Sequence, residues 1–257
     1  MKLLRVKYIL LLGFFTSSCS TIQKTPAVGI SVSDSNAVIA YAKVLENFVN
    51  DKGEINFDGL AKDKVDLEIY ISYVANKKFS DFSSKEILLA HHLNAYNALS
   101  MHTVIQKGIP KTNAGFKKVK FFFLTKMDVG GTQMSLVDYE NKFIRTIGED
   151  RVHWALNCMA VSCPRLPRKP FVAATLNQDL QALSVEFFNA NTNVRIDEAE
   201  KTVHVTEILK FFPKDFVPSK APSILDYVNL YRTARVPTNY EVEYIPYDWT
   251  INNSNRH

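Results

Sequence analysis

Residues 83–106, SSKEILLAHHLNAYNALSMHTVIQ, are the stretch that decides how this chain folds. Ser83 and Glu86 have the spacing of a capping box, in which a hydroxyl and a carboxylate bind the free backbone N–H groups at the start of a helix. Gly108 and Pro110 follow the stretch and are typical of the end of a helix. The sequence therefore predicts a long helix from Ser83 to about Gln106.

Two asparagines interrupt the apolar side of this predicted helix. At about 100° per residue, Asn94 and Asn97 share a narrow face with Ala90 and Met101. A buried amide left unpaired costs roughly 1–3 kcal/mol, so both side chains should have defined partners. They either bond neighbouring backbone, which is the commoner arrangement for buried side chains, or they line a functional site.

The histidines of the same stretch are predicted to lie on a different, mixed face. His91 and His92 are adjacent and lack the i, i+4 spacing that places two metal ligands on one side of a helix. The sequence therefore predicts no metal site, and no cofactor motif is present.

The remaining patterns predict an α+β fold. Helices are expected at 36–50, 66–76, 135–147, 174–190, 206–212 and 222–232; strands at 118–124 and 151–158; hairpins at 126–134 and 193–205; and an extended segment at 241–251. Because helices and strands do not alternate regularly, we expect a central, mostly antiparallel sheet packed against helices. Residues 36–257 should form a single domain.

The first residues of the chain have the pattern of a secretory signal. Three basic residues precede the apolar run 8–15, which is far too short to span a bilayer. The following Thr16-Ser17-Ser18-Cys19 resembles a bacterial lipoprotein cleavage box. We therefore predict a signal peptide at 1–18, lipidation of Cys19 and a tether at 19–35; a plain secreted protein cut near Ser18 is the alternative.

These features predict where the protein acts and what it contacts. Ser20 after the cysteine resembles the pattern sorted to an outer membrane, so the expected location is the cell envelope, anchored by lipid and facing the periplasm. Removal of residues 1–18 takes away three of the 31 basic residues and none of the 26 acidic ones. The resulting near-neutral balance argues against nucleic acid as a partner. The expected partners are the membrane and a small molecule, glycan or protein of the envelope.

Five segments, in order, resemble the motifs of the family catalogued as domain of unknown function 547, and in particular its bacterial lipoprotein branch. They are AHHLNAYNALSMHTVI, SLVDYENKFIR, RVHWALNCMAVSCPRL, VTEILKFFPKDF and IPYDWTIN. The resemblance extends over residues 36–252 and implies a common fold and exported or lipid-anchored members, but no activity. The family usually has glycine at the position of Met159. Since glycine permits a left-handed turn, Met159 is expected to make this turn differently.

The segment 153–167, HWALNCMAVSCPRLP, carries two cysteines five residues apart. In a regular strand, Cys158 would face the same side as Trp154 and Leu156, away from His153. In an oxidising compartment, Cys158 and Cys163 most simply form a disulfide, which would contribute roughly 2 kcal/mol by closing a short loop. A binding or scaffolding module with a disulfide-stabilised loop follows from this interpretation.

The alternative is a thiol-dependent hydrolase or transferase that acts on an envelope amide or ester. Cys163 would attack the carbonyl, His153 would take the thiol proton, and Asp248 or an asparagine would orient the imidazole. The order of elements also resembles papain- and transglutaminase-like layouts, although their nucleophile begins a helix where this chain has no sulfur. The side chains expected to line such a site are Asn94, Asn97, Arg151 and Asn157.

Overall fold

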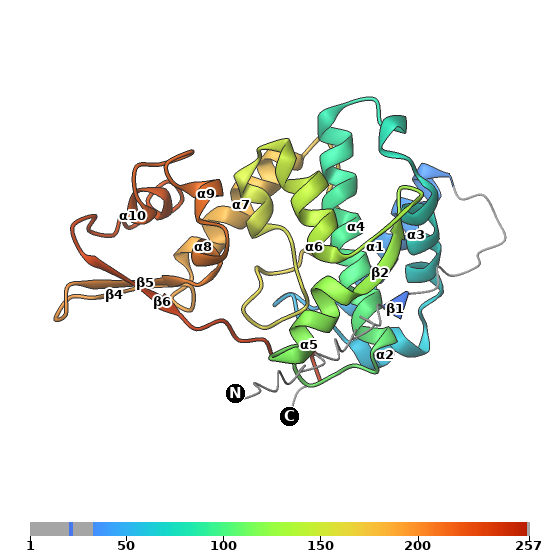
Figure 1. The fold of residues 1–257 in the computed structure, drawn as a ribbon, viewed down its shortest axis with the longest axis horizontal. Helices are drawn as coiled ribbons and strands as arrows, with labels where there is room; N and C mark the ends of the chain where they lie inside the picture. The colour runs from blue at the N-terminus through green and yellow to red at the C-terminus, as the bar shows by residue number, and fades with distance from the viewer. Residues whose placement is uncertain (1–20, 23–32, 256–257) are drawn as a thin grey trace, which may run out of the picture.

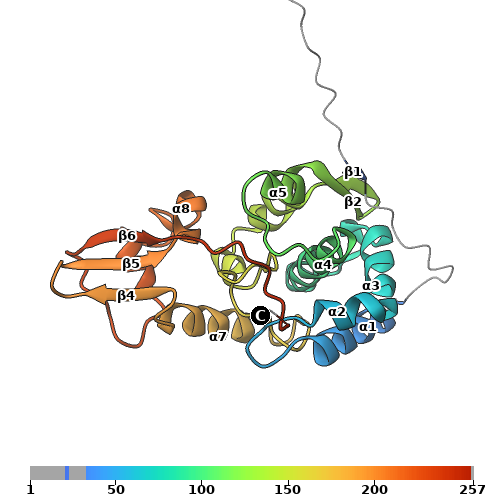
Figure 2. The ribbon, with the colours of Figure 1, turned by 90° about the horizontal axis from the view of Figure 1, so that it is seen from below.

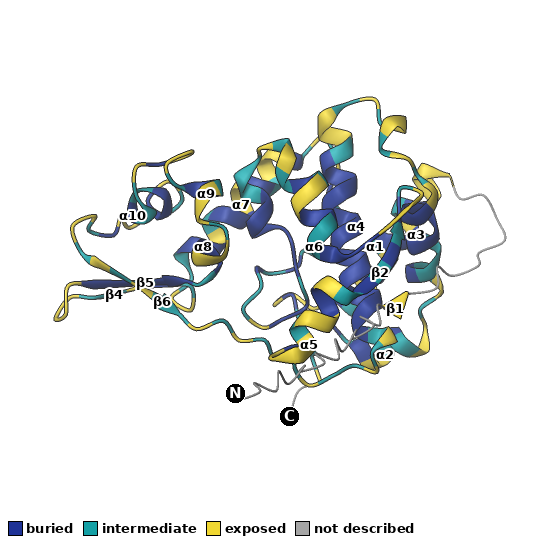
Figure 3. Ribbon diagram, viewed as in Figure 1, coloured by how far each residue is buried: buried dark blue, intermediate teal, exposed yellow. Residues whose placement is uncertain are grey.

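Helix α4 (Lys85–Gln106) runs through the middle of the larger part of the molecule (Figure 1). Its hydroxyl cap is Ser84, which accepts the N–H of Ile87 at 3.2 Å, so the helix begins one residue later than predicted. Every side chain from Leu89 to Val104 is buried (Figure 3). The structure is a computed structural model that describes residues 21–22 and 33–255.

Short helices surround α4. They are α1 (Asp34–Phe48), α2 (Phe57–Lys62), α3 (Val65–Asn76), η1 (Phe79–Asp81), α5 (Phe116–Val119), η2 (Lys120–Leu124), α6 (Leu136–Tyr139), η3 (Glu140–Ile144) and η4 (Arg145–Ile147). A small sheet lies beside them, in which β1 (Thr21–Ile22) runs parallel to β2 (Thr125–Val129) and β2 pairs antiparallel with β3 (Thr132–Met134). The turn between β2 and β3 uses two glycines with positive φ, as the hairpin prediction requires.

The second part of the molecule begins at α7 (Leu176–Asn189) and carries another three-stranded sheet. Strand β4 (Val194–Asp197) pairs antiparallel with β5 (Thr202–Thr206), which runs parallel to β6 (Glu241–Ile245). Three short helices connect β5 to β6: α8 (Ile208–Phe211), α9 (Pro213–Phe216) and α10 (Ile224–Val228).

Each part has its own hydrophobic core. The large core surrounds α4, and the small core surrounds Trp154, Phe188 and Tyr227. The 3₁₀ helix η5 (Asp150–Trp154) joins them, because Val152 packs into the large core and Trp154 into the small one. The segment that follows β6 then returns from the second sheet to the first part (Figure 2), where Thr250 bridges Thr112 and Ile251 bridges Ala160.

The predicted α+β class is confirmed, but the sheet differs from the prediction. Two separate three-stranded sheets, each with parallel and antiparallel pairs, replace one central antiparallel sheet. They are small because the large core is built around a helix, and each sheet packs at one edge of the helices rather than between them. Among the described residues, no helix is both long and apolar enough to cross a membrane.

Two predicted strands are helical instead. Residues 118–124 belong to α5 and η2, and residues 150–154 form η5. In the first segment Phe121 and Phe122 are both buried and Phe123 is exposed, so burial does not alternate as it would in a strand. A short apolar run cannot be assigned to strand or helix by periodicity alone. The other predicted helices and both hairpins are confirmed.

Two residues of the predicted tether at 19–35 are described apart from those at the start of α1. Thr21 and Ile22 pair with Thr125 and Lys126 as strand β1. The predicted signal peptide, Cys19 and residues 23–32 of the tether lie outside the described residues.

Candidate functional site

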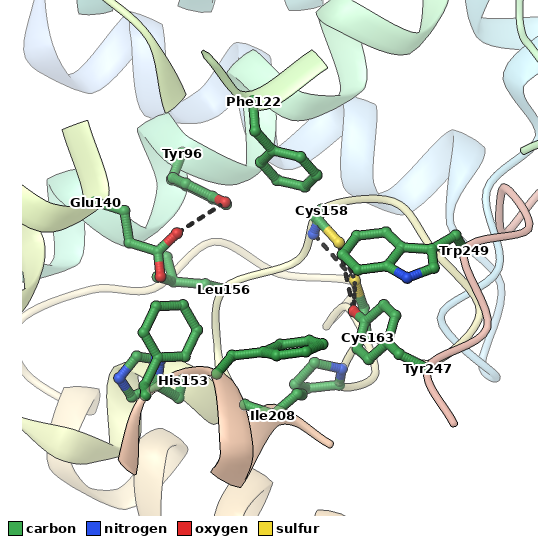
Figure 4. A pocket seen from close by; sticks show the side chains of 13 residues that line it. Tyr96, Phe122, Glu140, His153, Leu156, Cys158, Cys163, Ile208, Tyr247 and Trp249 are labelled. Atoms are coloured by element: carbon green, nitrogen blue, oxygen red, sulfur yellow. Dashed lines mark hydrogen bonds between the residues drawn. The ribbon is translucent and has the colours of Figure 1, made fainter. Parts of the chain in front are cut away.

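A pocket of about 100 Å³ lies where the two cores meet (Figure 4). Helices α4 and η3 supply one wall, the loop after η5 and the C-terminal segment supply another, and α8 closes the third side. The lining is mostly aromatic or aliphatic, with a few polar groups: Tyr96, Phe122, Glu140, His153, Leu156, Cys158, Cys163, Pro164, Ile208, Phe211, Phe212, Tyr247 and Trp249.

The two cysteines form one wall of the pocket. Their sulfur atoms lie 2.9 Å apart as two thiols in contact. The backbone N–H of Cys158 points at the Sγ of Cys163 at 3.1 Å, and the hydroxyl of Tyr247 lies 3.0 Å from the same sulfur. Negative charge on Cys163 is therefore surrounded by hydrogen-bond donors.

The neighbours shift the pKa values of the two thiols in opposite directions. Burial raises the pKa of Cys163, but hydrogen bonds from Cys158, Tyr247 and the backbone N–H groups of Ala160 and Cys158 outweigh it and hold this pKa below its ordinary value. The hydrogen bond to Cys163, with burial, raises the pKa of Cys158. Cys163 is thus the more acidic sulfur of the pair.

The loop that presents the sulfurs depends on Asn157 and Met159. The Asn157 side chain accepts the N–H of Met159 and donates to the carbonyl of Pro164, both at 2.7 Å, which ties the two ends of the loop together. Met159 is buried and has a φ of 68°. The expectation that Met159 turns differently from glycine is therefore wrong: methionine adopts the left-handed conformation, which costs roughly 1–2 kcal/mol.

Glu140 and Tyr96 form a polar pair in the opposite wall. The Tyr96 hydroxyl donates to Oε2 of Glu140 at 3.2 Å, and both side chains are buried. Burial raises the pKa of Glu140 against the opposing effects of His153, Tyr96 and Arg145. The carboxyl group is thereby kept closer to its neutral form, in which it can also donate a hydrogen bond.

His153 is held by an acidic residue that differs from the one predicted. Its Nε2 lies 2.8 Å from Oδ2 of Asp215, and its ring stacks on Phe212 with centroids 4.4 Å apart. Arg145 donates from Nε to Oδ2 of the same carboxylate at 2.6 Å and from Nη2 to Oδ1 at 2.7 Å. Burial would raise the pKa of Asp215, but His153 and Arg145 hold it well below its usual range.

The predicted site residues fall into two groups. His153, Cys158 and Cys163 line the pocket, whereas the side chain of Asp248 is exposed and accepts the N–H of Thr250. Arg151 also points elsewhere, toward Glu149 and Asn177. The prediction of Asp248 as the partner of His153 does not match the geometry, because α9 places Asp215 there instead.

The buried amides bond to backbone rather than line the pocket. Asn94 donates to the carbonyl of Phe171 and accepts its N–H, at 2.8 and 2.9 Å. Asn97 donates to the carbonyl of Ala155 at 3.0 Å and accepts the N–H of Asn157 at 2.7 Å. Helix α4 therefore holds the segments before and after the cysteine loop, which is the commoner of the two predicted arrangements.

Sequence reasoning missed three polar side chains of the pocket, Tyr96, Glu140 and Tyr247, and also Asp215, the partner of His153. Asp215 and Tyr247 lie within the fourth and fifth segments quoted above, and Glu140 and Tyr96 within the second and first. Their presence in a motif was visible, but only tertiary packing brings them to one pocket.

His153 and Cys163 line the pocket from different segments of the chain, η5 and the loop after it. Figure 4 shows His153 and Cys163 on opposite sides of the pocket, and Asp215 orients the imidazole of His153 through its Nε2. Aromatic rings make up much of the lining around these polar groups. Among the described residues, no three His, Cys, Asp or Glu side chains are arranged to hold a metal ion.

Comparison with known proteins agrees with the family resemblance over part of the chain. Residues 79–188 match the family described as "Protein of unknown function, DUF547". The match includes α4, Glu140, His153 and both cysteines, and ends before Asp215. No curated protein and no solved structure matches the chain. Residues 79–188 of this chain are therefore similar to the DUF547 family.

Proposed function

We propose that the protein is a binding module of the bacterial cell envelope, anchored by lipid on Cys19, whose pocket takes a small group of an envelope component. In this proposal Cys158 and Cys163 are joined by a disulfide that fixes one pocket wall. The bridge forms when the two thiols pass two electrons and two protons to a disulfide donor of the envelope. The outer membrane facing the periplasm is the proposed location.

One observation carries the choice of a binding module. The sulfur atoms of Cys158 and Cys163 touch each other, while His153, the base that a thiol enzyme would use, lies on the opposite side of the pocket (Figure 4). The hydrogen bond between His153 and Asp215 fixes the geometry of the opposite wall. Two adjacent thiols in an oxidising compartment favour a bridge.

The pocket chemistry suggests the class of ligand. Aromatic rings favour a planar or short aliphatic group, and the Glu140–Tyr96 pair offers one place for a neutral hydrogen-bonding end. A phenol- or amide-bearing group fits this description, either as a free small molecule, on a glycan or on a protein side chain.

Phenol is a suitable probe for this pocket. We expect saturable binding to the full chain, seen as a change in tryptophan fluorescence, because Trp249 lines the pocket. Phe211→Ala removes an exposed ring of the wall and should weaken binding. Phe123→Ala is the matched control, since Phe123 is also exposed but does not line the pocket. Equal affinity of the two variants, or no saturation, would argue against the pocket as a binding site.

The proposed anchor is tested separately. Cys19→Ala should give an unprocessed or soluble chain that no longer incorporates a labelled fatty acid. Equal labelling of the wild-type chain and the variant would reject lipidation at Cys19.

A thiol-dependent hydrolase or transferase is the second candidate, favoured by the hydrogen bonds that lower the pKa of Cys163. The Cys163 thiolate would attack an ester carbonyl and the C–O bond would break, releasing the alcohol. Water would then hydrolyse the thioester and restore the thiol. The predicted papain- or transglutaminase-like layout belongs to this candidate. Hydrolysis of p-nitrophenyl acetate that is lost in Cys163→Ala, and reduced in His153→Gln, would favour it over the binding module.

A further inference from the structure

Helix α5 and the π-helical turn η2 expose an apolar stripe. Phe116, Val119 and Phe123 are 72%, 40% and 50% exposed, whereas Phe121 and Phe122 on the other side are buried. Spacings of three and four residues place the exposed three on one side of the helical segment. Figure 3 shows this segment as an exposed element at the edge of the larger part. We call Phe116, Val119 and Phe123 the docking stripe.

Lysines flank the docking stripe. Residues 107–127 contain six lysines, at positions 107, 111, 117, 118, 120 and 126, and no aspartate or glutamate occurs between Glu86 and Asp128. Lys117 and Lys120 are exposed. Burial and the nearby Lys120 lower the pKa of Lys107, which is a sign of crowded positive charge. A stripe of apolar rings bordered by cations is complementary to an anionic lipid surface.

The start of the described chain lies beside the same segment. Strand β1 pairs in parallel with Thr125 and Lys126, which directly follow η2. Figure 2 shows β1, β2 and α5 on the same side of the larger part. Cys19 precedes Thr21 by two residues, and two residues of chain reach at most about 7 Å. An anchor on Cys19 would therefore hold the docking stripe close to the bilayer.

We propose that the docking stripe and its flanking lysines lie on the surface of an anionic membrane and fix the orientation of the domain. Phe116 and Phe123 enter the boundary between headgroups and acyl chains, and Lys117 and Lys120 contact lipid phosphates. Lys118 differs from them, because its Nζ lies 4.1 Å over the ring of Trp249 in the pocket wall. The proposed ligand pocket thus adjoins the membrane-facing side. This inference deepens the proposed membrane anchoring but does not depend on the lipid itself.

The test measures the reactivity of individual lysines on vesicles. The full chain is mixed with vesicles of phosphatidylcholine alone or with phosphatidylglycerol, treated with a membrane-impermeant acetylating reagent and mapped by peptide mass spectrometry. On anionic vesicles, Lys117 and Lys120 should lose reactivity several-fold, while the distant, exposed Lys201 and Lys214 should not. About 1 M salt, where the Debye length falls to about 3 Å, should reverse the protection.

The double variant Phe116→Ser/Phe123→Ser should lose this selective protection. Leu230→Ser is the matched control, since Leu230 is an exposed apolar residue in the other part of the molecule. Cys19→Ala separates the two proposals: protection that persists in Cys19→Ala supports docking even if the lipid anchor is absent. The proposed docking would be overturned by uniform protection of all lysines or by equal protection on neutral vesicles. Protection without vesicles, which self-association would give, would overturn it as well.

Discussion

His153 and Asp215 are joined by a hydrogen bond of 2.8 Å that connects the two parts of the molecule, with Arg145 on the same carboxylate. The histidine comes from η5 and the aspartate from α9, 62 residues further along the chain. The contact therefore positions one wall of the pocket and links the two hydrophobic cores.

Asp215→Asn should destabilise the protein by about 1–3 kcal/mol. The substitution leaves the side chains of the buried His153 and the half-buried Arg145 without the carboxylate that they bind. Chemical denaturation measures the change. Asp248→Asn is the matched control: its carboxylate is exposed, so its effect should stay within about 0.5 kcal/mol. Equal effects of the two substitutions would show that the Asp215 contact does not hold the pocket wall.

The side chain of Asn97 should matter as much for stability as a core residue. Asn97→Leu is close in size but leaves the carbonyl of Ala155 and the N–H of Asn157 unpaired, which should cost at least about 2 kcal/mol. The exposed Gln178→Leu on α7 serves as the control and should change stability little. An unchanged denaturation midpoint for Asn97→Leu would contradict the described role of this amide.

Met159 offers a test of backbone strain at the cysteine loop. Both Met159→Gly and Met159→Ala lose a buried side chain, but only glycine adopts a φ of 68° without strain. The glycine variant should therefore be the more stable of the two, by about 1 kcal/mol. At Met127, buried in strand β2, the order should be reversed. The same order at both positions would exclude strain at Met159.

Three buried histidines of α4 predict acid sensitivity. Burial lowers the pKa of His91 to about 3 and those of His92 and His102 to about 4. Unfolding restores values near 6.5, so the unfolded chain binds more protons below this pH and stability falls as the pH falls. The loss should approach about 4 kcal/mol per pH unit for the three together, between about pH 6 and 4.

Denaturant titrations at several pH values measure this slope. His102→Leu should reduce it by about one third, since each histidine contributes one proton. Gln178→Leu, an exposed substitution on α7 that removes no titratable group, is the control and should leave the slope unchanged. A pH-independent stability over this range would show that the α4 histidines are not held neutral by burial.

The sequence predicted most helices and turns because their signals are local. Ser135 caps α6, Gly130 and Gly131 turn the hairpin, and the ends of α4 were correct to one residue. It failed where burial depended on distant packing. His91, His92 and His102 were placed on a mixed face, but α4 is surrounded on all sides and all three are buried.

The sequence also predicted the candidate site only in part, because only local signals can be recognised in it. His153 and the two cysteines could be selected because their chemistry is distinctive within one short segment. Their partners could not, because Asp215 and Tyr247 reach them across 62 and 84 residues of chain. The assignment of 151–158 as a strand also misplaced the side chains, since a 3₁₀ helix does not alternate.

The state of the two sulfurs tests the binding-module proposal most directly. Trypsin should release Val152–Arg165, which contains both cysteines, from chain that was never reduced and was alkylated while unfolded. We predict that this peptide carries no alkyl group and has lost two hydrogen atoms, and that it takes up two alkyl groups after reduction. Rapid, stoichiometric alkylation of Cys163 in folded, never-reduced protein would contradict the bridge and favour the thiol enzyme.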